Sequence, residues 1–94
     1  MDAKLKKAWI KALRSGKYKQ AKYALRDSGG YCCLGVLCRV ARIPISRDGQ
    51  ECGGGQSYTP INNLIGASLA ETLTPKNDGG ESFSQIADYI EKNA

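Results

Sequence analysis

The 94-residue sequence predicts a small α+β domain, a single unit spanning residues 1–94. Three features of the chain support this fold class. Apolar residues recur at helical spacing near both ends, an almost uniformly apolar stretch lies in the middle, and a glycine-rich turn separates two short runs between them. Apolar residues make up 41% of the chain and charged residues 24%, so the composition suits a packed core rather than a disordered chain.

The first element is an amphipathic helix, expected over residues 2–14. Trp9 and Leu13 share its apolar face, and lysines occupy the opposite face. Asp2 suits the N-cap because its carboxylate can accept hydrogen bonds from the first free amides of the helix. Gly16 can take the left-handed conformation that ends many helices.

A β-hairpin and a buried helix follow. Residues 20–26 are expected to pair with residues 31–33 across the glycine-rich turn. The central helix is expected over residues 33–42, and it is apolar on nearly every side, so most of its surface must be buried. Only Arg39 and Arg42, three residues apart, mark an outward stripe. Gly35 would permit a close approach by the first helix, and Pro44 ends the segment.

Beyond the central helix, the sequence predicts a flexible glycine-rich loop and then short helices. The loop is expected over residues 44–58. Thr59 before a proline indicates the N-cap of the next helix. Ser68 is expected to begin a second short helix, which ends at Pro75. A turn over residues 77–80 precedes the last helix.

That last helix is expected to begin after Ser82 and to run to the C-terminus. Ser82 and Gln85 have the spacing of a capping box, in which each side chain bonds the other's backbone amide. Phe83, Ile86 and Ile90 then form an apolar stripe on one face.

Four cysteines, Cys32, Cys33, Cys38 and Cys52, have two interpretations. Three of them fall in the most apolar part of the chain, where reduced cysteine is a common core residue. A zinc site would require paired C-x-x-C spacings or histidine, and the chain has neither. Buried thiols are therefore the favoured interpretation, and no metal or other cofactor is expected.

Positive charge is concentrated at the front of the chain. Residues 1–26 contain nine basic side chains and one acidic one, whereas residues 27–94 contain five basic and eight acidic. Cations there alternate with tyrosines and an amide, a mixture that suits an anionic ligand with a stacking face. The candidate ligand-binding residues are Arg14, Lys17, Tyr18, Gln20, Lys22 and Arg26. The alternative is a solvated surface that keeps the protein soluble, with Tyr23 packed on the core.

Catalysis finds little support. Histidine is absent, which removes the commonest general base and its pairings with serine or cysteine. Asp78 and Glu81 are close in sequence, but a polar turn explains both. Cys52 is the one cysteine expected in a loop, where an open and electropositive setting could activate a thiol.

Two parts of the sequence resemble a small protein family encoded by tailed bacteriophages and prophages. The first comprises WIKALRSGKYKQ (residues 9–20) and GYCCLGVLC (residues 30–38). The second lies near the end, with ND at residues 77–78 and SFSQIAD at residues 82–88. The glycine-rich middle departs from the family pattern. The resemblance implies a phage origin and action in a bacterial cytoplasm, and it implies no catalytic residues.

Three functions follow as hypotheses. The first is a non-enzymatic phage accessory protein that inhibits host antiviral defence by binding an anionic nucleotide signal or a defence protein. The second is nucleic-acid binding, and the third is a small enzyme using Cys52 or a carboxylate pair. The N-terminus has no apolar signal region and no stretch is long enough to cross a bilayer, so no membrane partner is expected. Homo-oligomerisation is left open.

Overall fold

A computed structural model describes residues 1–54 and 57–94 and confirms the α+β class. Within these residues the helices are α1 (Ala3–Arg14), α2 (Cys33–Ala41), α3 (Thr59–Ile65), α4 (Ala67–Asp78) and α5 (Phe83–Asn93). The strands β1 (Arg26–Asp27) and β2 (Gly30–Tyr31) form an antiparallel pair.

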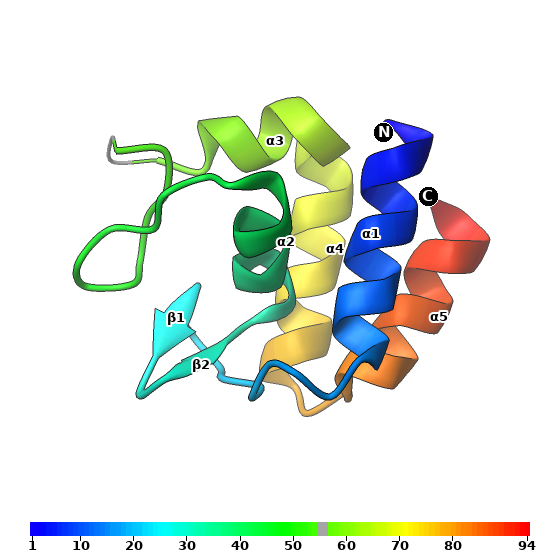
Figure 1. Cartoon of the computed structure of the whole chain (residues 1–94), viewed down its shortest axis with the longest axis horizontal. Helices are drawn as coiled ribbons and strands as arrows, with labels where there is room; N and C mark the ends of the chain where they lie inside the picture. Colours follow the sequence, from blue (N-terminus) through cyan, green and yellow to red (C-terminus); the bar gives the residue numbers. More distant parts are fainter. Residues whose placement is uncertain (55–56) are drawn as a thin grey trace.

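Helices α1 and α5 lie side by side and run in opposite directions, so the two termini meet at one end of the molecule (Figure 1). Helix α2 contacts α1, α3 and α4, and its side chains are buried from Cys33 to Cys38. Trp9 of α1 is fully buried, and its indole Nε1 donates a hydrogen bond of 2.9 Å to the carbonyl oxygen of Cys33. The predicted roles of α2 as the central helix and of Trp9 as a core residue are confirmed.

The ends of α1 and α5 agree with the sequence. The carboxylate of Asp2 accepts a hydrogen bond from the amide of Leu5, and Gly16 has a φ of +74°. At the start of α5, Ser82 and Gln85 form both bonds of the predicted capping box. Local sequence determines these ends because each depends on residues that are neighbours in the chain.

Helix α4 differs from the prediction at both ends. It begins at Ala67 after Gly66, without a side-chain cap, rather than at Ser68. Pro75 lies inside the helix, which continues to Asp78, so the predicted turn over residues 77–80 begins too early. A proline this close to the end removes few helical bonds, and burial of Asn77 holds the last turn against the core.

The hairpin is shorter than predicted, because residues 20–25 do not pair antiparallel with β2. Instead Tyr31 donates its amide hydrogen to the carbonyl of Lys19 and accepts from the amide of Ala21, which forms a parallel bridge at Gln20. Gly35 does permit a close approach, but not by α1. A Cβ atom at Gly35 would lie 1.9 Å from the carbonyl oxygen of Leu25.

Much of the glycine-rich loop is hydrogen-bonded. Ile45 and Ser57 both bridge to Cys52, and the buried Gly49 accepts hydrogen bonds at its carbonyl from the amides of Leu25 and Arg26. Residues 55–56 of the predicted flexible loop lie outside the described residues. The loop therefore also fixes the backbone just before β1.

Candidate functional site

The six predicted ligand-binding residues lie in the basic segment, residues 14–26, which runs from the end of α1 to β1. Arg14 faces α5, where its Nη2 atom lies 2.6 Å from a carboxylate oxygen of Asp88 and 3.2 Å from one of Glu91. The hydrogen bond from Arg14 lowers the pKa of the Glu91 carboxyl, and the bonds to Glu91 and Asp88 raise the pKa of Arg14. Arg14 therefore joins two helices.

Gln20 points inward and fixes the middle of the segment. Its Nε2 atom donates to the side-chain oxygen of Asn77 at 2.9 Å and to the carbonyl of Glu81 at 2.7 Å. Its Oε1 atom accepts from the amide of Phe83 at 3.1 Å. Both ends of the Gln20 amide are thus occupied within the protein, in a structural role.

Asn77 is the partner that sequence reasoning missed. Asn77 is fully buried, and among the residues described it is the one polar residue that is buried. Its Oδ1 atom accepts from Gln20 and from the amide of Cys33, and its Nδ2 atom donates to the carbonyl of Ala21 at 2.8 Å. A single side chain therefore connects α4, the start of α2 and the basic segment. The sequence predicts a turn at Asn77, because asparagine before glycines is typical of turns, and only the fold shows that its amide is buried.

Asp78 fixes the segment at Tyr23. The carboxylate of Asp78 accepts the backbone amide hydrogen of Tyr23 at 2.9 Å. Tyr23 has a φ of +67°, in the left-handed region that a bulky residue rarely adopts, and it is 74% exposed. The sequence left open that Tyr23 packs on the core, and the structure places it in solvent.

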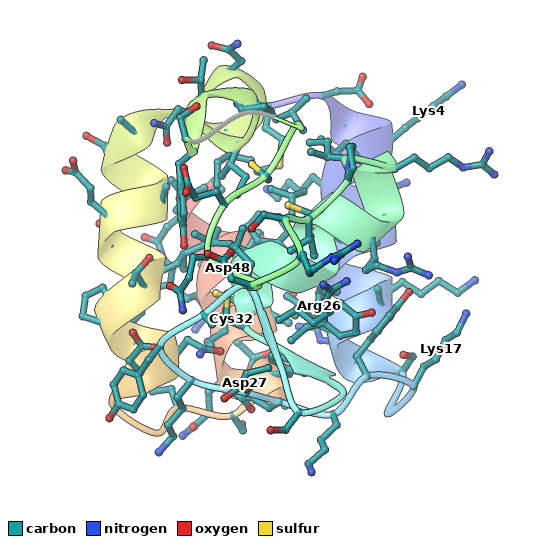
Figure 2. All side chains as sticks on the ribbon, turned by 90° about the vertical axis from the view of Figure 1, so that its left-hand side faces the viewer. Lys4, Lys17, Arg26, Asp27, Cys32 and Asp48 are labelled. Carbon is teal, nitrogen blue, oxygen red and sulfur yellow. The ribbon has the colours of Figure 1, made fainter. Side chains whose placement is uncertain are left out.

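Two further predicted residues are engaged with the protein. Tyr18 is half-buried against the core and meets the ring of Tyr31 edge to face, with centroids 5.6 Å apart. Arg26 donates through Nη2 to the carbonyls of Ser46 and Arg47. In Figure 2, Arg26 lies within the outline of the molecule near the loop that carries Asp48, whereas Lys17 extends away from it.

The remaining cations of the segment face solvent. Lys17, Lys19 and Lys22 are exposed, and none of them forms an ion pair within residues 1–54 and 57–94. Together with Tyr23 they make up what we call the outer surface of the basic segment. Lys17 and Lys22 are thus the two predicted ligand-binding residues that are exposed without an ion pair, and the ammonium of Lys17 lies 5.7 Å from the centre of the Tyr18 ring. Lys19 and Tyr23 are exposed as well.

Residues 1–48, just over half of the chain, match the model of a protein family described as Domain of unknown function (DUF8296). The chain belongs to this family. No curated protein and no solved structure matches it. The range matched to DUF8296 includes the whole basic segment and α2, whereas Asn77 and Asp78, which hold the segment in place, lie outside it.

The thiols of this DUF8296 member are buried. Cys52 was expected in an open loop, but it is 1% exposed and its Sγ atom donates to the carbonyl of Ser57. Burial raises the pKa of Cys38 to about 12 and raises the pKa of Cys32 and of Cys33. Among the residues described, no group of three or more potential metal ligands comes together. Neither an exposed thiolate nor a zinc site is found in that part of the chain.

The carboxylate pair is also divided between structural contacts. Asp78 accepts the amide of Tyr23, whereas Glu81 lies 3.5 Å from the ammonium of Lys76. Two surface hollows, one near Arg42 and one near Tyr58, contain no residue of the basic segment. In the described part of the chain, no helix has the length and apolarity needed to cross a membrane.

Proposed function

We propose that this protein is a non-catalytic phage accessory protein that inhibits host antiviral defence by binding an acidic surface of a defence protein. Its contact surface is the outer surface of the basic segment: Lys17, Lys19, Lys22 and Tyr23. The resemblance to small phage proteins supports the biological setting, and the segment supports the mode of action.

The observation that carries the proposal is that Tyr23 combines a left-handed backbone with an exposed side chain. A left-handed backbone costs a residue with a side chain about 1–2 kcal/mol, so a bulky residue is disfavoured there. Tyr23 nevertheless occupies such a position with 74% of its surface exposed, and its amide is held by Asp78. Core packing does not explain why an exposed tyrosine occupies this strained backbone conformation. A partner that buries the ring does explain it, because tyrosine is among the commonest residues at binding hot spots.

Fixed geometry makes this surface suitable for binding. The backbone on either side of Lys22 is held by the carbonyl of Ala21, bonded to Asn77, and by the amide of Tyr23, bonded to Asp78. Little backbone entropy is therefore lost when a partner binds, and preorganisation of this kind increases affinity. The exposed lysines of the segment favour an acidic partner and accelerate association.

The shape of the segment favours a protein over a small signal molecule. A small ligand usually occupies a concave pocket that covers most of its surface. Neither described hollow is lined by a residue of the basic segment, and the side chain of Tyr23 is exposed to solvent. The nucleotide-signal version of the first hypothesis therefore has less support at this surface.

The test is phage plating on bacterial strains that each carry one defined defence system. The strains express the wild-type protein, a variant with Lys19→Glu, Lys22→Glu and Tyr23→Ala, or a control with Lys7→Glu and Lys11→Glu on the exposed side of α1. We expect the wild type and the control to restore plating on at least one strain and the segment variant to fail. Equal activity of all three proteins, or no restoration by the wild type on any strain, would contradict the proposal.

Single-stranded nucleic acid is the second candidate, because an exposed ring beside ammonium groups also suits base stacking and phosphate contact. For this partner, affinity should fall with salt at a log–log slope of roughly −0.7 for each neutralised phosphate. Fluorescence anisotropy with a labelled oligonucleotide at two salt concentrations measures the slope. Binding that vanishes with Tyr23→Ala and shows this slope would favour nucleic acid over the protein target.

A further inference from the structure

The C-terminal end of α2 carries an open hollow with a volume of about 380 Å³. It is lined by Cys38, Arg39, Arg42, Ile43 and Pro44. The sequence indicated Arg39 and Arg42 as an outward stripe of the central helix and gave them no further role. The hollow is separate from the basic segment and shares no residue with it.

Both arginines at the hollow are free of carboxylates. Arg39 and Arg42 are exposed, and neither forms an ion pair with any residue of the described chain. Arg39 lies in the last turn of α2 and Arg42 is the C-cap residue that follows it, and both line the hollow. Arg14 and Arg26, by contrast, are bound by carboxylates or carbonyls of the protein itself.

The backbone at the helix end does not need these side chains. The amide of Arg42 donates to the carbonyl of Arg39, and the amide of Ile43 donates to the carbonyl of Cys38 at 2.8 Å. These bonds close the helix without a guanidinium group. Arg42 itself has a φ of +58°, a position where glycine or asparagine is usual. The guanidinium group of Arg42 is therefore not needed to end the helix.

We propose that this hollow binds a small organic phosphate, such as a nucleoside monophosphate. Two guanidinium groups match the oxygens of one phosphate through paired hydrogen bonds. Ile43 and Pro44 supply an apolar wall for the rest of the molecule. The volume lies within the usual range of small-ligand pockets, roughly 300–1,000 Å³. The assignment does not depend on the protein-binding surface, and either could be present without the other.

Calorimetric titration with AMP, adenosine and inorganic phosphate tests this assignment. We expect saturable binding of AMP, weaker binding of phosphate and none of adenosine. The variant Arg39→Lys/Arg42→Lys keeps both charges but loses the paired geometry, and it should weaken AMP binding roughly tenfold. The variant Lys7→Gln/Lys11→Gln should bind AMP like the wild type.

An amide-shift map of the wild-type protein gives a readout that requires no variant. AMP should shift the amides of Arg42 and Ile43 and leave those of Ala21 and Tyr23 in place. The proposal is overturned if AMP does not saturate, if the largest shifts fall elsewhere, or if the double lysine variant binds AMP as tightly as the wild type. Equal weakening in the α1 control would also overturn it, because the effect would then be diffuse attraction.

Discussion

The contact between α1 and α5 and the basic segment are both rich in cations, yet the fold uses these cations differently. Between the helices, Arg14 bonds two carboxylates, and the ammonium of Lys6 donates to the carbonyl of Ala94 at 2.6 Å. In the segment, uncharged or acidic groups hold the backbone and the lysines are left in solvent. Cations that join helices are a structural feature, whereas cations on a rigid and otherwise satisfied segment are available to a partner. Net charge alone does not distinguish the two.

The largest effect should come from removing the amide of Asn77. Asn77→Ala leaves the amide of Cys33, the side chain of Gln20 and the carbonyl of Ala21 without their partner inside the protein. We expect the free energy of unfolding to fall by about 3 kcal/mol or more, since each unpaired buried polar group costs roughly 1–3 kcal/mol. Urea denaturation measures it. Asn63→Ala, the same change at an exposed position of α3, should have little effect, and equal losses would refute the role of Asn77.

Gly35→Ala tests the close approach between α2 and the backbone of Leu25. The new Cβ atom would lie 1.9 Å from the carbonyl oxygen of Leu25, so the backbone that leads into β1 must move. Overpacking of this kind typically costs 1–3 kcal/mol, and we expect about the upper value. Gly29→Ala meets no atom within 4 Å and adds only the strain of a positive φ. Thermal unfolding should separate the two variants, and a Gly35→Ala protein as stable as the wild type would contradict the close approach.

Tyr23→Gly should act in opposite directions on stability and on binding. Glycine adopts the left-handed conformation freely, although it also gains entropy in the unfolded chain. We therefore expect the free energy of unfolding to rise, by at most about 1 kcal/mol. Restoration of phage plating should be lost in the same variant. A less stable Tyr23→Gly protein would show that the ring contributes to folding after all.

The smallest effect belongs to the contact between α1 and α5, and it depends on pH. Because Arg14 lowers the pKa of the Glu91 carboxyl, the folded state binds fewer protons there than the unfolded chain. The resulting stability is present above the ordinary glutamate pKa of 4.5 and is lost as the pH falls through the lowered value. Melting temperatures of the wild type and Arg14→Gln should converge below this range. Parallel curves down to low pH would contradict the pairing. These exposed groups are screened by salt, so high salt should also reduce the difference.

How much the sequence predicts depends on the range of the interaction. The caps of α1 and α5 and the apolar stripe of α5 use residues close together in the chain, and all three were predictable. The end of α4 was not, because Asn77 is held by Gln20 and Ala21, which lie 57 and 56 residues away. The local pattern of Asn77 and Asp78 before two glycines is that of a turn, and only the tertiary contacts reveal a buried polar connection.

The candidate site shows the same limit. Lys17 and Lys22 were predicted to bind a ligand, and both are exposed. The sequence did not distinguish them from Arg14, whose partners Asp88 and Glu91 come from the last helix. For Tyr23 the sequence left both core and surface open, and its exposure accompanies a positive φ that no local motif predicts. Arg39 and Arg42 were predicted to face outward, but the hollow between them depends on how the chain turns at Ile43 and Pro44.

Hydrogen exchange measured by NMR tests the central claim that the basic segment is rigid. We expect the amides of Ala21, Tyr23 and Tyr31 to exchange slowly, as α1 does, although the side chain of Tyr23 is exposed. In the Asn77→Ala variant, we expect the amides of the basic segment to lose protection before the amides of α1 do. Exchange of these three amides at unprotected rates, in wild-type protein whose helices remain protected, would contradict the account.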